Sequence, residues 1–223
     1  MKNNNYRLQF ITHHNDRYSY IDSARLALMG GCRWVQLRMK GADTATLELT
    51  AREVQSLCRV YDATFIIDDD VWLAKRIGAD GVHLGKEDMP LCEAREILGE
   101  GSIIGATVNS FEDISACLRR AKPDYFGCGP FRFTTTKEQL APTLGTEGYS
   151  NILHKMQAAN IDIPIIAIGG ISSADIEALL GCGLNGIALS GAVLNADNPT
   201  DEMNKITNII YGNNLYNNKK LEQ

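Results

Sequence analysis

The sequence predicts an α/β protein built as a single (β/α)8 TIM barrel. Three observations predict it: short β-branched runs alternate with helical patterns, several runs are continuously apolar, and no linker interrupts the alternation. Continuously apolar runs are typical of parallel strands covered on both faces. Eight units of about 25 residues with right-handed crossovers close most naturally into a barrel, with an open doubly wound sheet as the alternative.

The barrel is expected to occupy residues 1–211 as one domain. Residues 212–223 lack apolar periodicity and are expected to form a disordered tail. A chain of 223 residues with 44% hydrophobic residues can bury one large core. The expected strands are Leu8–Thr12, Trp34–Arg38, Thr64–Asp68, Gly81–Leu84, Ile103–Thr107, Tyr125–Cys128, Pro164–Ile168 and Gly186–Leu189.

Helix start and stop signals lie between these runs. A capping Ser or Asp accepts a hydrogen bond from the first free N–H groups of a helix, and a proline at the start sacrifices no hydrogen bond. Glycine after the last turn ends a helix. The helices expected from these signals are Ser19–Met29, a segment from Asp43 to Tyr61, Leu91–Leu98 after Pro90, Phe111–Arg120 after Ser110, and Ser173–Cys182 after Ser172.

Composition excludes several classes of function. The net charge of −5 argues against a nucleic-acid binder, which needs a basic patch or stripe. No apolar run is long enough to span a membrane, so no membrane partner is expected. The six cysteines show no C-x-x-C spacing, which favours buried free thiols in a reducing compartment and hence a cytoplasmic protein. The sequence leaves the oligomeric state open.

Strand ends decide the function of such a barrel, because the carboxyl ends of all its strands meet at one face. The second expected strand ends in Gln36, Arg38 and Lys40, which alternation places on the same side. Two cations that prolong a buried strand need anionic partners. The pattern indicates an anion site.

Acidic residues follow the third and fourth expected strands. Asp69 and Asp88 come from neighbouring strand ends, where their oxygens could share one hard cation such as Mg2+. Capping of the next helices is an equally open interpretation for both. For Asp70, capping of the helix that begins near Val71 is the preferred interpretation.

A second anion site is indicated by small residues after the last two strands. Gly169–Gly170 and Ser190–Gly191 stand where barrels of this kind bind phosphate. The loop that contains Thr134, Thr136 and Lys137 adds hydroxyl and ammonium donors to the mouth. Arg38, Lys40, Lys137 and a metal on Asp69 and Asp88 suit a diphosphate on one substrate, and the glycine and serine loops suit a monophosphate on another.

On these residues the chain resembles the thiamine-phosphate synthase family over about residues 6 to 211. The family's motifs Q-L-R-x-K, G-V-H-L-G-Q-x-D, G-P-x-x-x-T-x-T-K and A-I-G-G-I match Gln36–Lys40, Gly81–Asp88, Gly129–Lys137 and Ala167–Ile171. The resemblance implies a magnesium-dependent transferase. It would join a hydroxymethylpyrimidine diphosphate to a hydroxyethylthiazole phosphate and release thiamine phosphate and pyrophosphate.

The resemblance also assigns roles by position. Asp69 and Asp88 would ligate Mg2+, while Arg38, Lys40 and Lys137 would grip the diphosphate as the catalytic cations. Gln36 would lie near the pyrimidine. The remaining substrate-binding residues would be Asp68, Thr107 (where the family commonly has serine), Thr134, Thr136, Gly170, Ser190 and Gly191.

The chain departs from the family pattern at three places. Asp68 replaces the usual asparagine and Lys86 the usual glutamine, which suggests a compensating ion pair between them. The serine after the last strand comes one residue early, at Ser190 rather than at the position of Gly191. Arg132–Phe133 replaces the usual Phe-Pro.

Two rival functions remain from the sequence. A thiazole tautomerase-like isomerase of the same family would handle one phosphate substrate, and would not need the diphosphate cations or the paired aspartates. A catalytically inactive barrel that binds thiamine intermediates is the other rival. Only Asp68 and the shifted serine favour that second interpretation.

Overall fold

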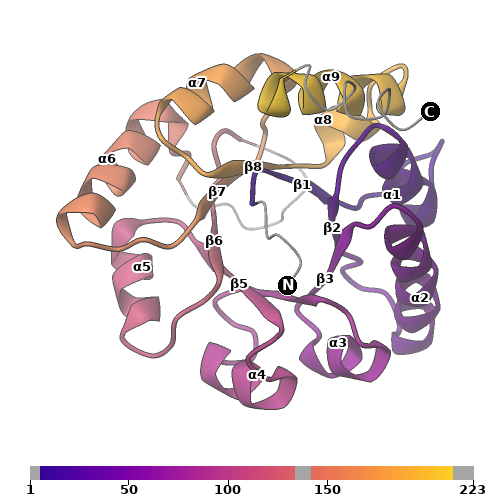
Figure 1. Ribbon diagram of the computed structural model, residues 1–223, viewed down its shortest axis with the longest axis horizontal. Coiled ribbons are helices and arrows are strands. Elements are labelled where there is room, and N and C mark those ends of the chain that lie inside the picture. The colour runs from indigo at the N-terminus through magenta and orange to yellow at the C-terminus, as the bar shows by residue number, and fades with distance from the viewer. Residues whose placement is uncertain (1–5, 134–141, 213–223) are drawn as a thin grey trace, which may run out of the picture.

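Eight parallel strands form a closed barrel in the computed structural model, which describes residues 6–133 and 142–212 (Figure 1). Each strand pairs with the next along the chain, and β8 pairs with β1, so the sheet has no free edge. The strands are β1 (Leu8–Ile11), β2 (Trp34–Leu37), β3 (Thr64–Asp68), β4 (Gly81–Leu84), β5 (Ile103–Val108), β6 (Tyr125–Cys128), β7 (Ile165–Ile168) and β8 (Gly186–Leu189).

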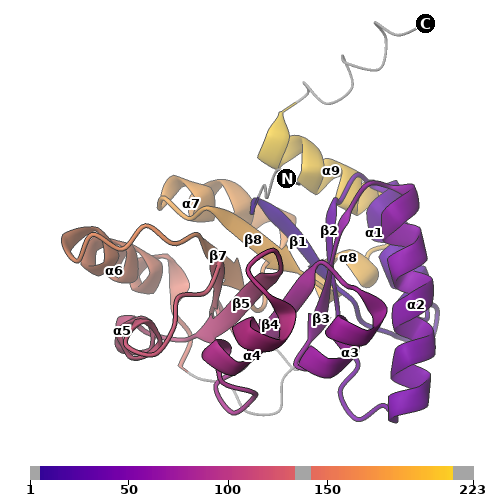
Figure 2. The same cartoon turned by 60° about the horizontal axis from the view of Figure 1, so that its bottom comes forward.

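The helices form a ring outside the strands (Figures 1 and 2). They are α1 (Tyr20–Met29), α2 (Thr44–Val60), α3 (Val71–Ile77), α4 (Leu91–Leu98), α5 (Phe111–Leu118), α6 (Gly145–Ala158), the 3-10 turn η1 (Ser173–Asp175), α7 (Ile176–Gly181), α8 (Gly191–Leu194) and α9 (Pro199–Tyr211). This arrangement confirms the predicted barrel, and every expected strand matches within one residue at each end.

Side-chain caps begin several of these helices as expected. Ser19 accepts from the backbone N–H of Asp22, and Asp43 accepts from two N–H groups of α2. Ser110 caps α5, while Pro90 precedes α4 without a side-chain cap. The helix expected after Ser172 begins instead as the 3-10 turn η1 and continues as the short α7.

Apolar side chains that alternate along the strands fill much of the barrel interior: Ile11, Trp34, Ile66, Ile103, Tyr125, Ile166 and Ala188. Ile11 and Ala188 lie near the carboxyl ends of β1 and β8, and the others lie deeper in the barrel. The other strand face packs against the helices in two larger apolar clusters. The interior packing fills the amino-terminal end of the barrel. A ligand site is therefore expected at the carboxyl ends of the strands, where the residues change from apolar to polar.

The end of the barrel domain, the cysteines and the helix lengths can each be compared with the sequence predictions. Helix α9 ends at Tyr211, and the tail expected at 212–223 lies outside the described residues apart from Gly212. All six cysteines are free, but only Cys32, Cys58 and Cys128 are buried. Cys117 and Cys182 are partly exposed, and Cys92 is exposed. Among the described helices, none is both long and apolar enough to cross a membrane.

Candidate active site

A cavity of about 600 Å³ opens at the carboxyl ends of the strands. It receives side chains from strands far apart in the sequence, as the barrel fold requires. The predicted site residues that line it are Gln36, Arg38, Lys40, Asp68, Asp69, Asp88, Thr107, Gly169, Gly170, Ser190 and Gly191. Thr134, Thr136 and Lys137 lie outside the described residues.

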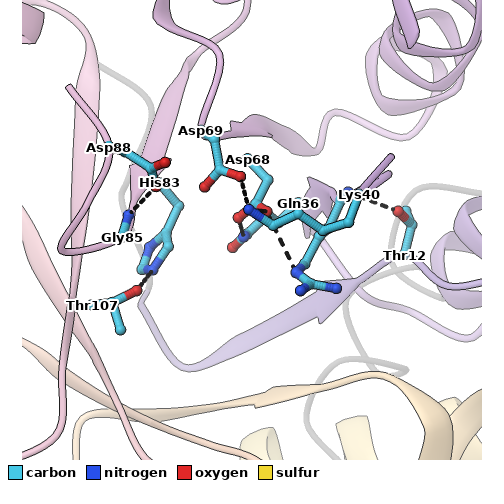
Figure 3. Close-up of polar contacts among 10 residues, drawn as sticks. Thr12, Gln36, Lys40, Asp68, Asp69, His83, Gly85, Asp88 and Thr107 are labelled. Carbon is cyan, nitrogen blue, oxygen red and sulfur yellow. Dashed lines mark hydrogen bonds and ion pairs between the residues drawn. The ribbon is translucent and has the colours of Figure 1, made fainter. Parts of the chain in front are cut away.

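One side of the cavity is built from charged side chains that follow β2 and β3 (Figure 3). Asp68 accepts a hydrogen bond from Gln36 Nε2 at 2.6 Å and lies 3.4 Å from Arg38 Nε. Lys40 Nζ lies 3.9 Å from Asp68 and makes a direct ion pair with Asp69. The backbone N–H of Arg38 donates to Thr12 Oγ1 at 3.0 Å, which fixes the end of β2 to the end of β1.

Asp68 is the most buried carboxylate of this side, with a side chain 9% exposed. Burial raises the pKa of Asp68 to about 7, helped by the charge of Asp69 and opposed by Arg38 and Lys40. Burial works against the ammonium of Lys40 too, but the hydrogen bond to Asp69 and the surrounding carboxylates leave its pKa raised overall. Arg38 and Lys40 therefore pair with two neighbouring carboxylates, Asp68 and Asp69, and the charge of Asp69 disfavours the ionised form of Asp68.

Asp69 and Asp88 approach one another across the ends of β3 and β4. Burial and a hydrogen bond shared with Asp69 raise the pKa of Asp88. Asp88 Oδ2 accepts from the backbone N–H of Gly85 at 2.6 Å, and Asp69 has the unusual backbone angle φ 63°. Two carboxylates this close together form a donor set that fits a divalent cation with oxygen ligands.

The ion pair expected between Asp68 and Lys86 is wrong. Lys86 Nζ binds Asp113 Oδ2 at 2.6 Å, at the start of α5, whereas Asp68 is paired with Arg38 and Lys40. Lys86 therefore points to the helix of the next unit and does not line the cavity. The capping predicted for Asp70 is confirmed, since Asp70 Oδ1 accepts from the backbone N–H of Leu73 at 2.8 Å.

The opposite side of the cavity is built from small residues after β7 and β8. Gly169 and Gly170 have φ angles of 96° and 68°, which glycine adopts without strain. Ser190 follows the inward alternation of β8 and lines the cavity, so the one-residue shift does not remove its side chain from the site. Within the part of the chain that the structure describes, its Oγ is buried without a hydrogen-bond partner.

Arg132 ties the loop after β6 to the loop after β7. Its guanidinium forms two 2.7 Å hydrogen bonds with the carboxylate of Asp175 and a third, of 3.1 Å, with the carbonyl of Gly170. Asp175 also accepts from the backbone N–H and the hydroxyl of Ser172. The residue that departs from the family pattern thus braces the glycine loop.

The sequence analysis did not include His83 or Thr12 among the site residues, although both line the cavity. His83 precedes the end of β4, and its Nε2 lies 2.9 Å from Thr107 Oγ1. Thr12 fixes the backbone of Arg38. Inward alternation along β4 was the available signal for His83, whereas Thr12 falls on the same side of its strand as Phe10, so alternation did not indicate it.

The fold and the cavity together define a class: a TIM barrel whose mouth has charged side chains on one side and glycine-rich loops on the other. The sequence matches the family described as thiamine monophosphate synthase over residues 8–193. The thiamine-phosphate synthase of Phocaeicola vulgatus is 55% identical over 209 residues, covering 94% of this chain and 100% of the relative. That of Bacteroides fragilis is 55% identical over 202 residues, covering 91% of this chain and 98% of the relative.

A solved structure agrees with the sequence relatives. The thiamine phosphate pyrophosphorylase of Pyrococcus furiosus superposes with a TM-score of 0.80 at 35% identity, covering 93% of this chain and 96% of that one. The chain belongs to the thiamine monophosphate synthase family. The family resemblance inferred from the motifs is thereby confirmed.

Proposed function

We propose that the chain is a magnesium-dependent transferase. It condenses 4-amino-2-methyl-5-hydroxymethylpyrimidine diphosphate with 4-methyl-5-hydroxyethylthiazole phosphate, giving thiamine phosphate and pyrophosphate. Membership of the family supports the reaction. The free cysteines support a reducing compartment such as the cytoplasm.

The observation that carries this proposal is the state of Gln36. Its side chain is buried, and Nε2 donates to Asp68 Oδ1 at 2.6 Å. Because Nε2 is the atom that faces Asp68, the carbonyl oxygen of Gln36 faces away from it. Among the described residues, that buried Oε1 has no hydrogen-bond partner. A buried acceptor left unpaired is costly, and the amino group of an aminopyrimidine supplies the missing donor.

The leaving diphosphate needs positive charge. In the condensation, the thiazole nitrogen lone pair forms a bond to the pyrimidine methylene carbon, and the C–O bond to the diphosphate breaks with its electron pair. Negative charge develops on the leaving oxygens. Arg38, Lys40 and Lys137 would bind those oxygens. The thiazole nitrogen attacks through a free lone pair, so the step needs no strong protein base.

Asp69 and Asp88 would hold the magnesium ion. Their mutual approach supports this, because a cation between them replaces the proton that they otherwise favour. Mg2+ supplies Lewis-acid stabilisation of a diphosphate when bound. Lys40, which now pairs with Asp69, would be drawn towards the diphosphate oxygens.

The thiazole phosphate would bind the opposite side of the cavity. The loop at Gly170, the backbone at Gly191 and the unpaired hydroxyl of Ser190 support this. Thr134 and Thr136 would add hydroxyl donors. Two anchors on opposite sides would hold the nucleophile and the methylene carbon in line.

Pyrophosphate release by the purified full-length chain tests the proposal. We expect turnover only when both substrates and Mg2+ are present. Isomerisation of a thiazole phosphate alone would support the tautomerase-like rival. Tight binding of thiamine phosphate without any turnover would support the inactive binding barrel, and either result would contradict the proposal.

A further inference from the structure

A line of hydrogen bonds crosses the barrel beneath the cavity and belongs to neither anion site. Gln9 Nε2 donates to the Tyr125 hydroxyl at 3.2 Å, which lies 3.0 Å from His83 Nδ1. His83 Nε2 then lies 2.9 Å from Thr107 Oγ1, and Thr107 lines the cavity. Figure 3 shows this contact between the two side chains. Gln9, Tyr125 and His83 are 2%, 0% and 8% exposed, so water does not compete for these bonds.

Two glycines make room for this line. A Cβ atom on Gly127 of β6 would lie 2.8 Å from His83 Cε1. A Cβ atom on Gly105 of β5 would lie 2.5 Å from His83 Nδ1 and would also collide with the Tyr125 ring. The barrel therefore gives up two interior side chains so that two polar rings can meet, at a place where an apolar layer would otherwise fill the space.

Each hydrogen bond along this line has a defined donor and acceptor. Gln9 donates an amide N–H to the phenol oxygen of Tyr125. Within the described residues, His83 Nδ1 is the remaining hydrogen-bond partner of that phenol, so the phenol proton goes to Nδ1. Burial raises the pKa of Tyr125 above its usual range, which keeps the proton on the phenol. The neutral imidazole then carries its own proton on Nε2.

We infer that His83 is a positioning residue that makes Thr107 a hydrogen-bond donor to the pyrimidine diphosphate. The Nε2–H of His83 donates to Thr107 Oγ1, so the threonine must turn its own O–H elsewhere, into the cavity that it lines. A diphosphate offers only acceptors there. In this tautomer neither nitrogen of His83 has a free lone pair, so the histidine orients and does not act as a base.

Thr107 is placed for the diphosphate substrate rather than for the thiazole phosphate. It lies on β5, next to β4, whose following loop carries Asp88. Ser190 and Gly170 follow β8 and β7, across the mouth. The inference rests on the proposed function for the identity of the ligand, but the tautomer of His83 does not depend on it.

Nuclear magnetic resonance of the ligand-free, full-length protein tests the tautomer directly. The chain has four histidines, so ¹⁵N-labelled imidazole signals can be assigned with His83→Gln as the reference. We expect the Nε2–H tautomer for His83 in the wild type, and a mixture of tautomers in Tyr125→Phe. The Nδ1–H tautomer in the wild type, or no change in Tyr125→Phe, would overturn the inference.

Kinetics test the consequence. Tyr125→Phe keeps the ring but removes the phenol, and we expect about a 10-fold lower kcat/KM for the pyrimidine diphosphate with an unchanged KM for the thiazole phosphate. Thr107→Val should cause a similar loss, and Thr107→Ser should restore most of it. In the double variant Tyr125→Phe with Thr107→Val, the losses should not multiply, because both remove one interaction.

Tyr149→Phe is the matched control. Tyr149 is equally buried, and its hydroxyl donates to the Cys128 carbonyl at 2.7 Å on the helix side of β6. It should lose stability without changing the kinetic constants. Multiplying losses, or a Thr107→Ser variant as damaged as Thr107→Val, would contradict the inference. A wild type without turnover that still shows the Nε2–H tautomer would refute the proposed function and leave His83's orientation established.

Discussion

The two sides of the cavity mouth differ in the groups that they offer to an anionic ligand. The side after β2, β3 and β4 uses charged side chains, which pair among themselves and raise the pKa of Asp68 and Asp88. The side after β7 and β8 uses glycine backbone and one hydroxyl, without a charged group of its own among Gly169, Gly170, Ser190 and Gly191.

The difference teaches how each side meets its ligand. The carboxylates of the charged side crowd one another, and the proposed divalent cation with a diphosphate would relieve that crowding. Among its described residues, the side after β7 and β8 has no such repulsion between charged groups. Its loop geometry is set by the glycine φ angles and by the hydrogen bonds between Arg132 and Asp175, so ligand binding there should depend on backbone conformation. Changes of charge should therefore damage the first side, and changes of backbone the second.

The largest effect is expected for Asp69→Asn. Loss of one proposed metal ligand should lower kcat by about 100-fold or more, because charge stabilisation of the leaving group is lost. The KM for the thiazole phosphate should stay unchanged. Steady-state pyrophosphate release across a Mg2+ series measures both.

Asp70→Asn is the control for that change. Asp70 is the next residue, but it caps α3 through Leu73 and does not line the cavity. It should change stability little, because asparagine caps a helix about as well as aspartate, and it should keep its Mg2+ dependence. Equal losses of activity in the two variants would remove the metal role from Asp69.

Gly170→Ala should damage the other side. Gly170 has a φ of 68°, and an added Cβ would lie 2.6 Å from Arg132 Cγ. Strain of about 1–2 kcal/mol in this loop should raise the KM for the thiazole phosphate by roughly 10-fold. The KM for the pyrimidine diphosphate should change little. Initial rates with each substrate varied in turn measure the split.

Gly183→Ala provides a matched backbone control. Gly183 has a φ of 96° in the turn before β8, and its added Cβ would meet only Leu153, at 3.8 Å. The substitution should lower thermal stability without altering either KM. A raised KM for the thiazole phosphate in this variant as well would mean that general loosening, rather than the phosphate loop, explains the Gly170→Ala result.

Asp68→Asn should stabilise the metal-free protein at alkaline pH. Burial raises the pKa of Asp68 from 3.8 to about 7, so its contribution to stability is present below pH 3.8 and is lost as the pH rises through 7. Asparagine carries no charge to bury. Thermal unfolding in a chelator should give a higher Tm for the variant at pH 8, with a gain that shrinks towards pH 4. A gain that grows on acidification would contradict this.

The smallest effect is expected for Asp175→Asn. Its bond to Arg132 lowers the pKa of Asp175 to about 2, so the stabilisation is present above pH 3.8 and is lost as the pH falls through 2. Arg132 is half exposed, which limits the loss to about 1 kcal/mol at neutral pH. Denaturant unfolding should show the deficit at pH 7 and little of it near pH 2. An equal deficit at both values would mean that the charge is irrelevant.

Most of the fold and much of the site follow from sequence patterns. Alternation placed Gln36, Arg38 and Lys40 on one side, and the structure brings them to the cavity. The partner of Lys86 did not follow, because its long side chain reaches Asp113 on α5, and sequence gives no distance between side chains. The bond between His83 and Thr107 was also hidden, since it needs the space left by Gly105 and Gly127.

One measurement tests the central claim of two separately built anion sites. Calorimetric binding of pyrophosphate with Mg2+, and of the thiazole phosphate alone, should be compared in the wild type, Asp69→Asn and Gly170→Ala. The account predicts that Asp69→Asn weakens only pyrophosphate binding and that Gly170→Ala weakens only thiazole phosphate binding. If each variant weakens both ligands to the same extent, the mouth is a single site and the account is wrong.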